Sequence, residues 1–189
     1  INTTRNGLSE GIIWDYKNNE IANWLLDFYG INPNLTPDLV DNFTNQGATN
    51  SKSSEETGLN IGIPITYRAG DQPNNALALN VFDNGEVAAS GGTSGVIYSI
   101  TNNINSKEPS RINHFAHVNY NDNNKSIGKL LCINGAGIQY RWLRNHSIGK
   151  SYEKMNEQAS SIPVGSEGIS VIPFGNGAER MLNNKNIGT

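Results

Sequence analysis

Two short runs in the sequence carry the residue types that phosphoryl transfer needs. The run Gly70-Asp71-Gln72 places one carboxylate in a glycine-marked turn, after an apolar strand pattern and before an expected helix. The run 91–95, Gly-Gly-Thr-Ser-Gly, offers backbone N–H groups and hydroxyls beside another strand pattern. A carboxylate can accept the proton of an alcohol, and N–H and hydroxyl donors can hold a phosphate group. Together the two runs indicate transfer of a phosphoryl group to a hydroxyl.

Each run also has a purely structural explanation. A carboxylate at the start of a helix is a common N-cap, which stabilises a helix by roughly 1 kcal/mol. That role for Asp71 is compatible with a catalytic one. The glycine-rich run also matches a hairpin turn, because short glycine motifs arise by chance in many proteins. The order and spacing of both runs together favour phosphoryl transfer over two ordinary turns.

Other catalytic chemistries find less support in the sequence. His114 and His117 are three residues apart in a strand pattern, which places them on opposite faces of a sheet and is poor geometry for chelating one metal. No grouping of cysteine and histidine has the spacing of a zinc site. Ser94 as a hydrolase nucleophile is disfavoured, since its run lacks the strand-to-helix elbow of such enzymes. We therefore expect no metal site built from protein ligands.

The composition argues against several classes of partner. The net charge is -3 and the basic residues are scattered, so there is no nucleic-acid stripe and no polybasic membrane patch. No apolar run approaches the roughly twenty residues of a membrane span, and no secretory signal pattern occurs. The single Cys132 excludes an internal disulfide and favours a reducing compartment. We expect a cytoplasmic protein with a small-molecule partner, and neither nucleic-acid nor membrane partners.

Hydrophobic periodicity predicts strands and helices in both halves of the chain. A helix is expected over residues 21–28, with Trp24 on its apolar face. Continuous apolar runs predict buried strands at Ile61–Tyr67 and Ile169–Phe174. Further strands are expected at 11–16, 86–90, 96–100, 112–120 and 129–133, and further helices at 51–57, 71–81, 136–145 and 151–160. This mixture has α/β or α+β character, with a domain junction near residues 83–86.

With these elements around them, the motifs resemble the FGGY carbohydrate kinases in collinear order. Residues 9–15 and the turn at Asp71 resemble the first domain of that family. Residues 135–138, Gly-Ala-Gly-Ile, resemble the helix start beside the nucleotide in the second domain. Residues 172–180 resemble a segment in which many members have a proline, an aromatic residue and Gly-Glu-Arg. The resemblance covers nearly the whole chain and implies part of an actin-like (ribonuclease H-like) ATPase fold of the α/β class.

The resemblance implies roles for individual residues. Asp71 corresponds to the catalytic base that accepts the proton of the sugar hydroxyl, and Gln72 to a residue that orients the substrate or the Mg²⁺ shell. The implied nucleotide-binding residues are Gly92, Thr93, Ser94, Gly137 and Arg141, the last at a position where some members have Gln. ATP and Mg²⁺ are the implied cofactors. D-Xylulose is the first expected acceptor, with glycerol, ribulose and gluconate as alternatives.

The same resemblance implies part of a kinase. Family members are more than twice as long, and neither their Asp-x-Gly-Thr phosphate loop nor their Gly-Gly-Gly-Ala-type adenine loop is visible here. Residues 1–85 are expected to end the first, sugar-binding domain, and residues 86–189 to begin the second, nucleotide-binding domain. The 189 residues alone are expected to lack appreciable kinase activity, and exposed strand edges favour self-association as a homodimer. A non-catalytic sugar-binding module on the same scaffold is the alternative.

Overall fold

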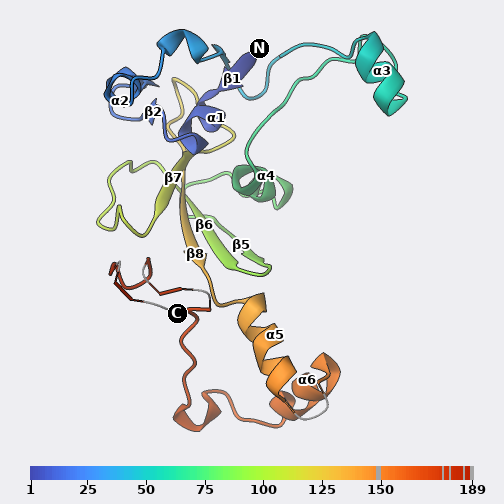
Figure 1. Cartoon of the computed structure of the whole chain (residues 1–189), viewed down its shortest axis with the longest axis vertical. Coiled ribbons are helices and arrows are strands. Elements are labelled where there is room, and N and C mark those ends of the chain that lie inside the picture. The colour runs from blue at the N-terminus through green and yellow to red at the C-terminus, as the bar shows by residue number, and fades with distance from the viewer. Residues whose placement is uncertain (148–149, 176, 179, 185, 188–189) are drawn as a thin grey trace. The chain divides into compact units, whose positions relative to one another are not determined.

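A computed structural model describes residues 1–147, 150–175, 177–178, 180–184 and 186–187 of the chain (Figure 1). Two compact units are present. The first comprises residues 1–88, 98–107 and 114–129, and the second comprises residues 89–97, 108–113 and the described part of 130–189. Strands and helices alternate along the chain, so the mixed α/β character predicted from the sequence is confirmed. No helix in the described ranges is long and apolar enough to cross a membrane.

The chain up to residue 81 is built from short elements. Its helices are α1 (Arg5–Glu10), α2 (Asn23–Phe28), α3 (Ser51–Thr57) and α4 (Asp71–Ala78), with a 3-10 turn at Pro33–Leu35. Its strands are β1 (Asn2–Thr4), β2 (Trp14–Asp15), β3 (Glu20–Ile21) and β4 (Asp38–Val40). β1 pairs with β4 in parallel, and β2 pairs with β3 in antiparallel orientation. This part of the first unit thus has small paired strands with short helices between them, and Asp71 begins the helix α4.

A four-stranded sheet follows in the order β5-β6-β8-β7. Its strands are β5 (Val87–Gly91), β6 (Gly95–Thr101), β7 (Asn113–Ala116) and β8 (Ile127–Ile133), all within one or two residues of a predicted strand except at the end of β7. Two helices come next, α5 (Gly137–His146) and α6 (Tyr152–Ser160), and then a 3-10 turn at Ser166–Gly168. The predicted helices at 136–145 and 151–160 and the adjacency of the third and fourth strands are confirmed.

Polar side chains fix the starts of several helices. The Thr4 hydroxyl accepts a hydrogen bond from the Gly7 N–H at 3.0 Å and caps α1. Asn50 caps α3 in a reciprocal capping box with Ser53, and Ser151 caps α6. Each cap satisfies an N–H group that has no partner inside its helix. Gly58 ends α3 with a φ of 75°, a left-handed conformation that glycine adopts at little cost.

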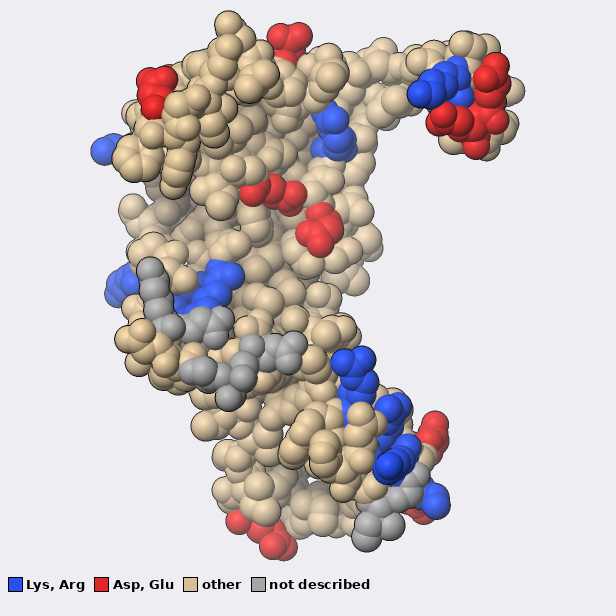
Figure 2. Space-filling view, viewed as in Figure 1, with Lys and Arg blue, Asp and Glu red and all other residues tan. Residues whose placement is uncertain are grey.

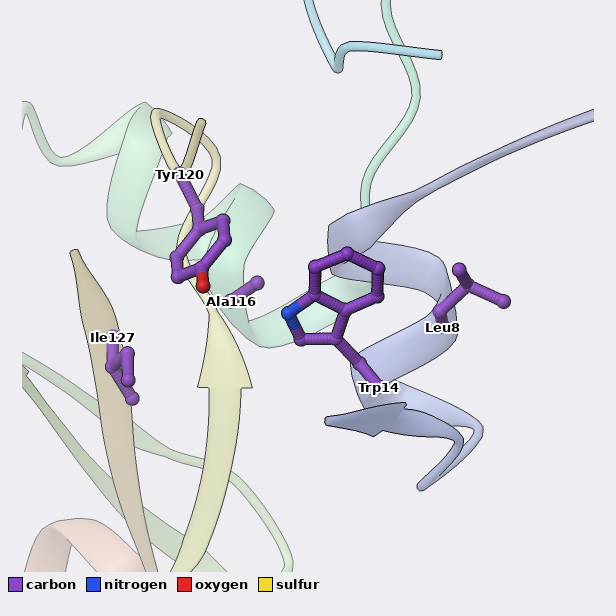
Figure 3. Close-up of a cluster of buried hydrophobic side chains, with 5 residues drawn as sticks. All are labelled: Leu8, Trp14, Ala116, Tyr120 and Ile127. Carbon is purple, nitrogen blue, oxygen red and sulfur yellow. The ribbon is translucent and has the colours of Figure 1, made fainter. Parts of the chain in front are cut away.

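A small aromatic and aliphatic core lies within the first unit (Figure 3). It consists of Leu8, Trp14, Ala116, Tyr120 and Ile127, each at most 7 % exposed. The Trp14 and Tyr120 rings meet edge to face, with centroids 6.4 Å apart. Such pairs add about 0.5–1.5 kcal/mol to the burial of their area. This core joins α1 and β2 to β7 and β8, and so fixes the position of α1.

The prediction that Trp24 belongs to the core is wrong. Trp24 is 64 % exposed, whereas Leu26 of the same helix is 2 % exposed. α2 is only six residues long, and the described structure buries a single side chain of it. Successive residues of an α-helix are rotated by about 100° about the helix axis, so residues two positions apart point in nearly opposite directions. A helix that buries Leu26 therefore directs Trp24 away from that contact.

Two predicted buried strands are also absent from the described structure. Residues 61–67 form only two isolated bridges, Ala48 to Pro64 and Phe43 to Tyr67. Gly62 has a φ of 87° and Pro64 has no N–H to donate, and both features interrupt a ladder. The segment Ile169–Phe174 does not form a strand, and Val171 within it is 71 % exposed. The predicted strand at 11–16 shortens to β2, because Gly11 and Ile12 form a turn in which Ile12 has a φ of 63°.

His117 is fully buried in the first unit, between a carbonyl and a phenol. Its Nε2 lies 3.0 Å from the Val81 carbonyl oxygen, which can only accept, so Nε2 carries the proton. Nδ1 then accepts from the Tyr98 hydroxyl at 3.2 Å. Burial removes the imidazolium from water and lowers the pKa of His117 to about 4. The ring is therefore held neutral in one tautomer.

We expect this histidine to make the fold acid-sensitive. The pKa in the folded state lies below that of an exposed histidine, so the unfolded chain binds more protons between about pH 6.5 and pH 4. Its contribution to the free energy of unfolding is complete above pH 6.5 and falls by about 3 kcal/mol as the pH drops to 4. Urea titrations across this range test this, with His117→Gln as the comparison. Equal pH slopes for the two proteins would contradict the prediction.

Candidate active site

The first part of the candidate site is the turn that begins α4. Gly70 is the N-cap and Asp71 the first helical residue, so the expectation that Asp71 itself caps the helix is wrong. Asp71 is exposed, Gln72 is half-buried, and Pro73 is buried in the first turn, where its missing N–H has no intrahelical partner to lose. A carboxylate at this position is favoured by the helix dipole and remains accessible to a ligand. The predicted helix over 71–81 is confirmed but ends at Ala78.

Residues of α1 hold this turn in place. The Gly70 N–H donates to the Asn6 Oδ1 at 2.7 Å, and the Asn6 Nδ2 donates to the Ala116 carbonyl at 2.5 Å. Asn6 is completely buried, so both bonds form away from water. The Glu10 carboxylate occupies the space that a Cβ at position 70 would need. A larger residue at position 70 would therefore displace the Glu10 side chain, while the φ of -71° at Gly70 suits any residue.

Sequence reasoning did not identify Asn6 or Glu10 as parts of this site. They lie sixty or more residues before the Asp71 turn, and no local pattern connects the two segments. The sequence shows only that a glycine precedes Asp71, and the approach of Glu10 to that glycine is evident from the structure alone.

The second part of the candidate site is the loop between β5 and β6, in the second unit. The Gly92 carbonyl accepts from the Gly137 N–H at 2.9 Å, and the Thr93 carbonyl accepts from the Ile138 N–H at 3.0 Å. The Gly92 N–H is itself bonded to the Ser94 carbonyl at 2.9 Å. The first two N–H groups of α5 thus attach the loop to the start of that helix.

These bonds determine which donors of the loop are available. The N–H groups of Gly92 and Gly137 are occupied and cannot bind a phosphate in this conformation. Within the described ranges, the hydroxyls of Thr93 and Ser94 form no hydrogen bond to the protein. Thr93 is exposed and Ser94 half-buried. The loop can therefore offer two hydroxyls to a ligand, while the glycines serve its packing.

Glycines also bring the later segment of the second unit against the start of α5. A Cβ at Gly137 would overlap the Gly92 carbonyl, and a Cβ at Gly135 would overlap the backbone of Pro173. The Gly135 N–H donates to the Pro173 carbonyl at 2.9 Å. Gly175 adopts a φ of 55° against Asn134. Residues 135–138 and 172–175, which both carry the family resemblance, are thus in contact.

A hollow of about 320 Å³ lies beside this junction. Its described lining is Ile138, Gln139, Trp142 and Gly175. The Gln139 Nε2 donates to the Ile172 carbonyl at 3.2 Å, whereas Trp142 is 59 % exposed and its ring packs against that of His146. Arg141 is exposed on the same helix and is not among the described lining residues. A hollow with an aromatic wall and one amide suits a planar, partly polar group.

The remaining residues of the family-like segment have structural contacts. The Arg180 Nε donates to the Arg111 carbonyl at 3.0 Å, and its guanidinium also contacts the Asn113 side chain. Glu179, which precedes Arg180, lies outside the described residues. Arg180 therefore ties the end of the chain to the segment before β7 within the second unit.

The predicted site residues thus form two groups. Asp71 and Gln72 lie together on α4 in the first unit. Gly92, Thr93, Ser94 and Gly137 lie together in the second unit, joined by hydrogen bonds, with Arg141 one turn further along α5. The first group offers an accessible carboxylate, and the second offers two hydroxyls, while the N–H groups of Gly92 and Gly137 are already bonded.

Known proteins resemble the chain over most of its length. No family profile matches it. It is 24 % identical over 156 residues to a xylulose kinase of Bacillus subtilis, which covers 82 % of the chain and 30 % of that kinase. The crystal structure of a xylulose kinase from Rhodospirillum rubrum matches 91 % of the chain with a TM-score of 0.76 and 22 % identity. A Plasmodium falciparum glycerol kinase with ADP matches 82 % of it with a TM-score of 0.72 and 20 % identity.

These similarities cover only part of each relative. The chain spans about a third of the length of the kinases it matches, 35 % of the Rhodospirillum rubrum chain and 31 % of the Plasmodium falciparum chain. In sequence and in fold, the chain is similar to FGGY carbohydrate kinases, and its mixed α/β fold matches part of their actin-like ATPase fold.

Proposed function

We propose that the natural protein containing this chain transfers the γ-phosphoryl group of ATP to a hydroxyl of a sugar or polyol. The observation that supports this most directly is the attachment of loop 92–94 to the start of α5, which leaves the Thr93 and Ser94 hydroxyls available beside a hollow. An accessible carboxylate on α4 supplies the complementary proton acceptor. The relatives named above are carbohydrate kinases.

In the proposed reaction, Asp71 accepts the proton of the attacking hydroxyl. The sugar oxygen forms a bond to the γ-phosphorus while the bond from that phosphorus to the β–γ bridging oxygen breaks, and ADP leaves. Gln72 orients the acceptor from the same helix turn. Thr93 and Ser94 donate hydrogen bonds to the nucleotide phosphates, and Arg141 adds positive charge near them. Positioning and electrostatic stabilisation supply most of the rate enhancement in such reactions.

Mg²⁺ enters this proposal as part of the nucleotide substrate. Within the described residues, no group of three or more histidine, cysteine, aspartate or glutamate side chains could hold a metal ion. A magnesium ion typically keeps several waters and binds through substrate phosphates with one or two carboxylates. The hollow lined by Ile138 and Trp142 is proposed to take the base of the nucleotide. A cytoplasmic location follows from this proposal, because ATP is supplied there.

The acceptor proposed first is D-xylulose, giving D-xylulose 5-phosphate. Its support is the sequence similarity to a xylulose kinase, while the fold is shared with a glycerol kinase at similar identity. Glycerol, ribulose and gluconate are therefore kept as alternative acceptors. Sequence identities near 20 % reflect a common fold and leave the acceptor pocket free to differ.

A coupled assay of the complete natural protein tests the proposal. ADP release is measured with ATP and Mg²⁺ against D-xylulose, ribulose, glycerol and gluconate, and we expect turnover with at least one of them. Calorimetry with the same compounds runs in parallel. Binding of a sugar without ADP release across the panel would instead indicate the non-catalytic sugar-binding module.

A further inference from the structure

The last residue of α1, Glu10, lies against the turn that presents Asp71. Its carboxylate occupies the space beside Gly70 in which any side chain at that position would begin. Figure 2 shows acidic surface over α4 and beside it over the end of α1. Both residues belong to the first unit, and Asn6 of the same helix fixes the Gly70 backbone at 2.7 Å. Asn6 thus holds the Asp71 turn beside α1, and the Glu10 carboxylate lies next to Gly70, the residue before Asp71.

No cation of the described residues balances this pair. Neither Glu10 nor Asp71 forms an ion pair within the described ranges, and the nearby Arg68 guanidinium is bonded to the Asn2 carbonyl. Partial burial, and next the charge of Asp71, raise the pKa of Glu10. The other titratable groups facing Glu10 are Tyr16 and Tyr98, whose pKa values burial raises, so they remain neutral. The turn thus carries two carboxylates that form no ion pair with any described residue.

The two carboxylates favour neutral acceptors over anionic ones. A half-buried carboxylate without a protein donor is stabilised by a ligand hydroxyl, and hydrogen bonds to charged groups are stronger than those between neutral groups. An anionic acceptor would instead bring a third negative charge to the same turn, which like-charge repulsion disfavours. A neutral polyol with two adjacent hydroxyls can donate one proton to each carboxylate.

We propose that Glu10 is a specificity-determining residue, which accepts a hydrogen bond from the hydroxyl next to the reacting one and excludes anionic acceptors such as sugar acids. The inference rests on the proposed kinase function and deepens it. It divides the candidate acceptors into two groups. Xylulose, ribulose and glycerol are neutral and fit the pair of carboxylates, whereas gluconate carries a charge that Glu10 opposes.

The test compares kcat/KM for D-xylulose, glycerol and gluconate in the complete natural protein and in Glu10→Gln. The amide keeps the shape of the side chain but removes its charge. We expect KM for the neutral acceptors to rise about tenfold, since a charge-assisted hydrogen bond is replaced by a neutral one, while kcat changes little. The ratio of neutral to anionic acceptor use should fall by at least the same factor. Glu20→Gln, at an exposed position of β3, is the matched control and should leave both values unchanged.

A pH profile gives a readout that a structural role would not produce. In the natural protein, KM for a neutral acceptor should rise as the pH falls through the raised pKa of Glu10, because the protonated acid no longer accepts as a charged group. In Glu10→Gln, KM for the same acceptor should not rise as the pH falls. If Glu10→Gln does not fold, Glu10→Asp serves instead. Its side chain carries the same charge but is shorter by one methylene, so the carboxylate lies further from the acceptor. KM for neutral acceptors should then rise while gluconate stays excluded.

The outcomes separate the two proposals. No turnover of any acceptor by the natural protein would refute the kinase function itself. Turnover with an unchanged acceptor ratio and pH profile in Glu10→Gln would refute the role of Glu10 alone. A large loss of kcat at unchanged KM would also overturn it, since that would place Glu10 in proton transfer.

Discussion

Replacement of Asp71 by Asn is expected to lower kcat of the natural protein by about 10²–10⁴-fold, the range that general base catalysis contributes. Asp71 is the first residue of α4, exposed, and held by a turn whose backbone bonds do not involve its side chain. The amide can occupy the same place but cannot accept a proton from the attacking hydroxyl. ATP binding should stay within twofold of the natural protein, because the proposed nucleotide contacts are on loop 92–94 and α5.

Two measurements check this expectation. The coupled assay gives kcat and KM for the acceptor, and calorimetry with ATP and Mg²⁺ gives nucleotide affinity. The control is Asp83→Asn, which removes one charge from an exposed turn after α4 and should leave turnover unchanged. Near-normal turnover in Asp71→Asn would show that another group takes the proton.

Local signals in the sequence predicted the elements that carry the candidate site. Asp83-Asn84-Gly85 and the 91–95 run are turn sequences, and they bound the strands β5 and β6 as predicted. Gly70-Asp71 likewise marked the start of α4 to within one residue. Turn and cap residues act on neighbouring backbone groups, so their effect is readable without knowledge of the rest of the fold. The family resemblance then supplied roles for these residues, which remain proposals.

Apolar runs were less informative. Residues 61–67 and 169–174 have the composition of buried strands, yet Ile61 is 65 % exposed and Ile172 is 61 % exposed. A run of apolar residues indicates a preference for burial but does not name the strand that would pair with it. Trp24 shows the same limit within a helix, where Leu26 takes the buried position instead.

Contacts between distant segments could not be predicted at all. The Asn6 side chain reaches Gly70 and Ala116 across 64 and 110 residues of sequence, and Glu10 approaches the same turn. Neither residue has a motif around it that indicates such a partner. Local patterns therefore identified the Asp71 carboxylate but not the Glu10 carboxylate that lies beside its turn.

Replacement of Gly137 by Ala is expected to weaken ATP binding about tenfold or more. The new Cβ would overlap the Gly92 carbonyl, which accepts the Gly137 N–H at 2.9 Å. Relief of that overlap requires the loop to move away from α5, and overpacking of this kind typically costs about 1–3 kcal/mol. The bond from Ile138 N–H to the Thr93 carbonyl at 3.0 Å would lengthen with it, displacing the Thr93 and Ser94 hydroxyls.

A glycine of the hairpin that contacts Gly137 provides the matched control. Gly91 ends β5 next to the loop, but a Cβ there meets no atom within 4 Å, and its φ lies outside the left-handed region. Gly91→Ala should therefore bind ATP as the natural protein does. Like Gly137→Ala, it adds one methyl group near the contact between the hairpin and α5. Calorimetry with ATP and Mg²⁺ on the three complete proteins measures the effect, and thermal unfolding reports whether each is folded. Equal ATP affinity for folded Gly137→Ala and Gly91→Ala would mean that the position of loop 92–94 does not control nucleotide binding, and would place the phosphate site elsewhere in the protein.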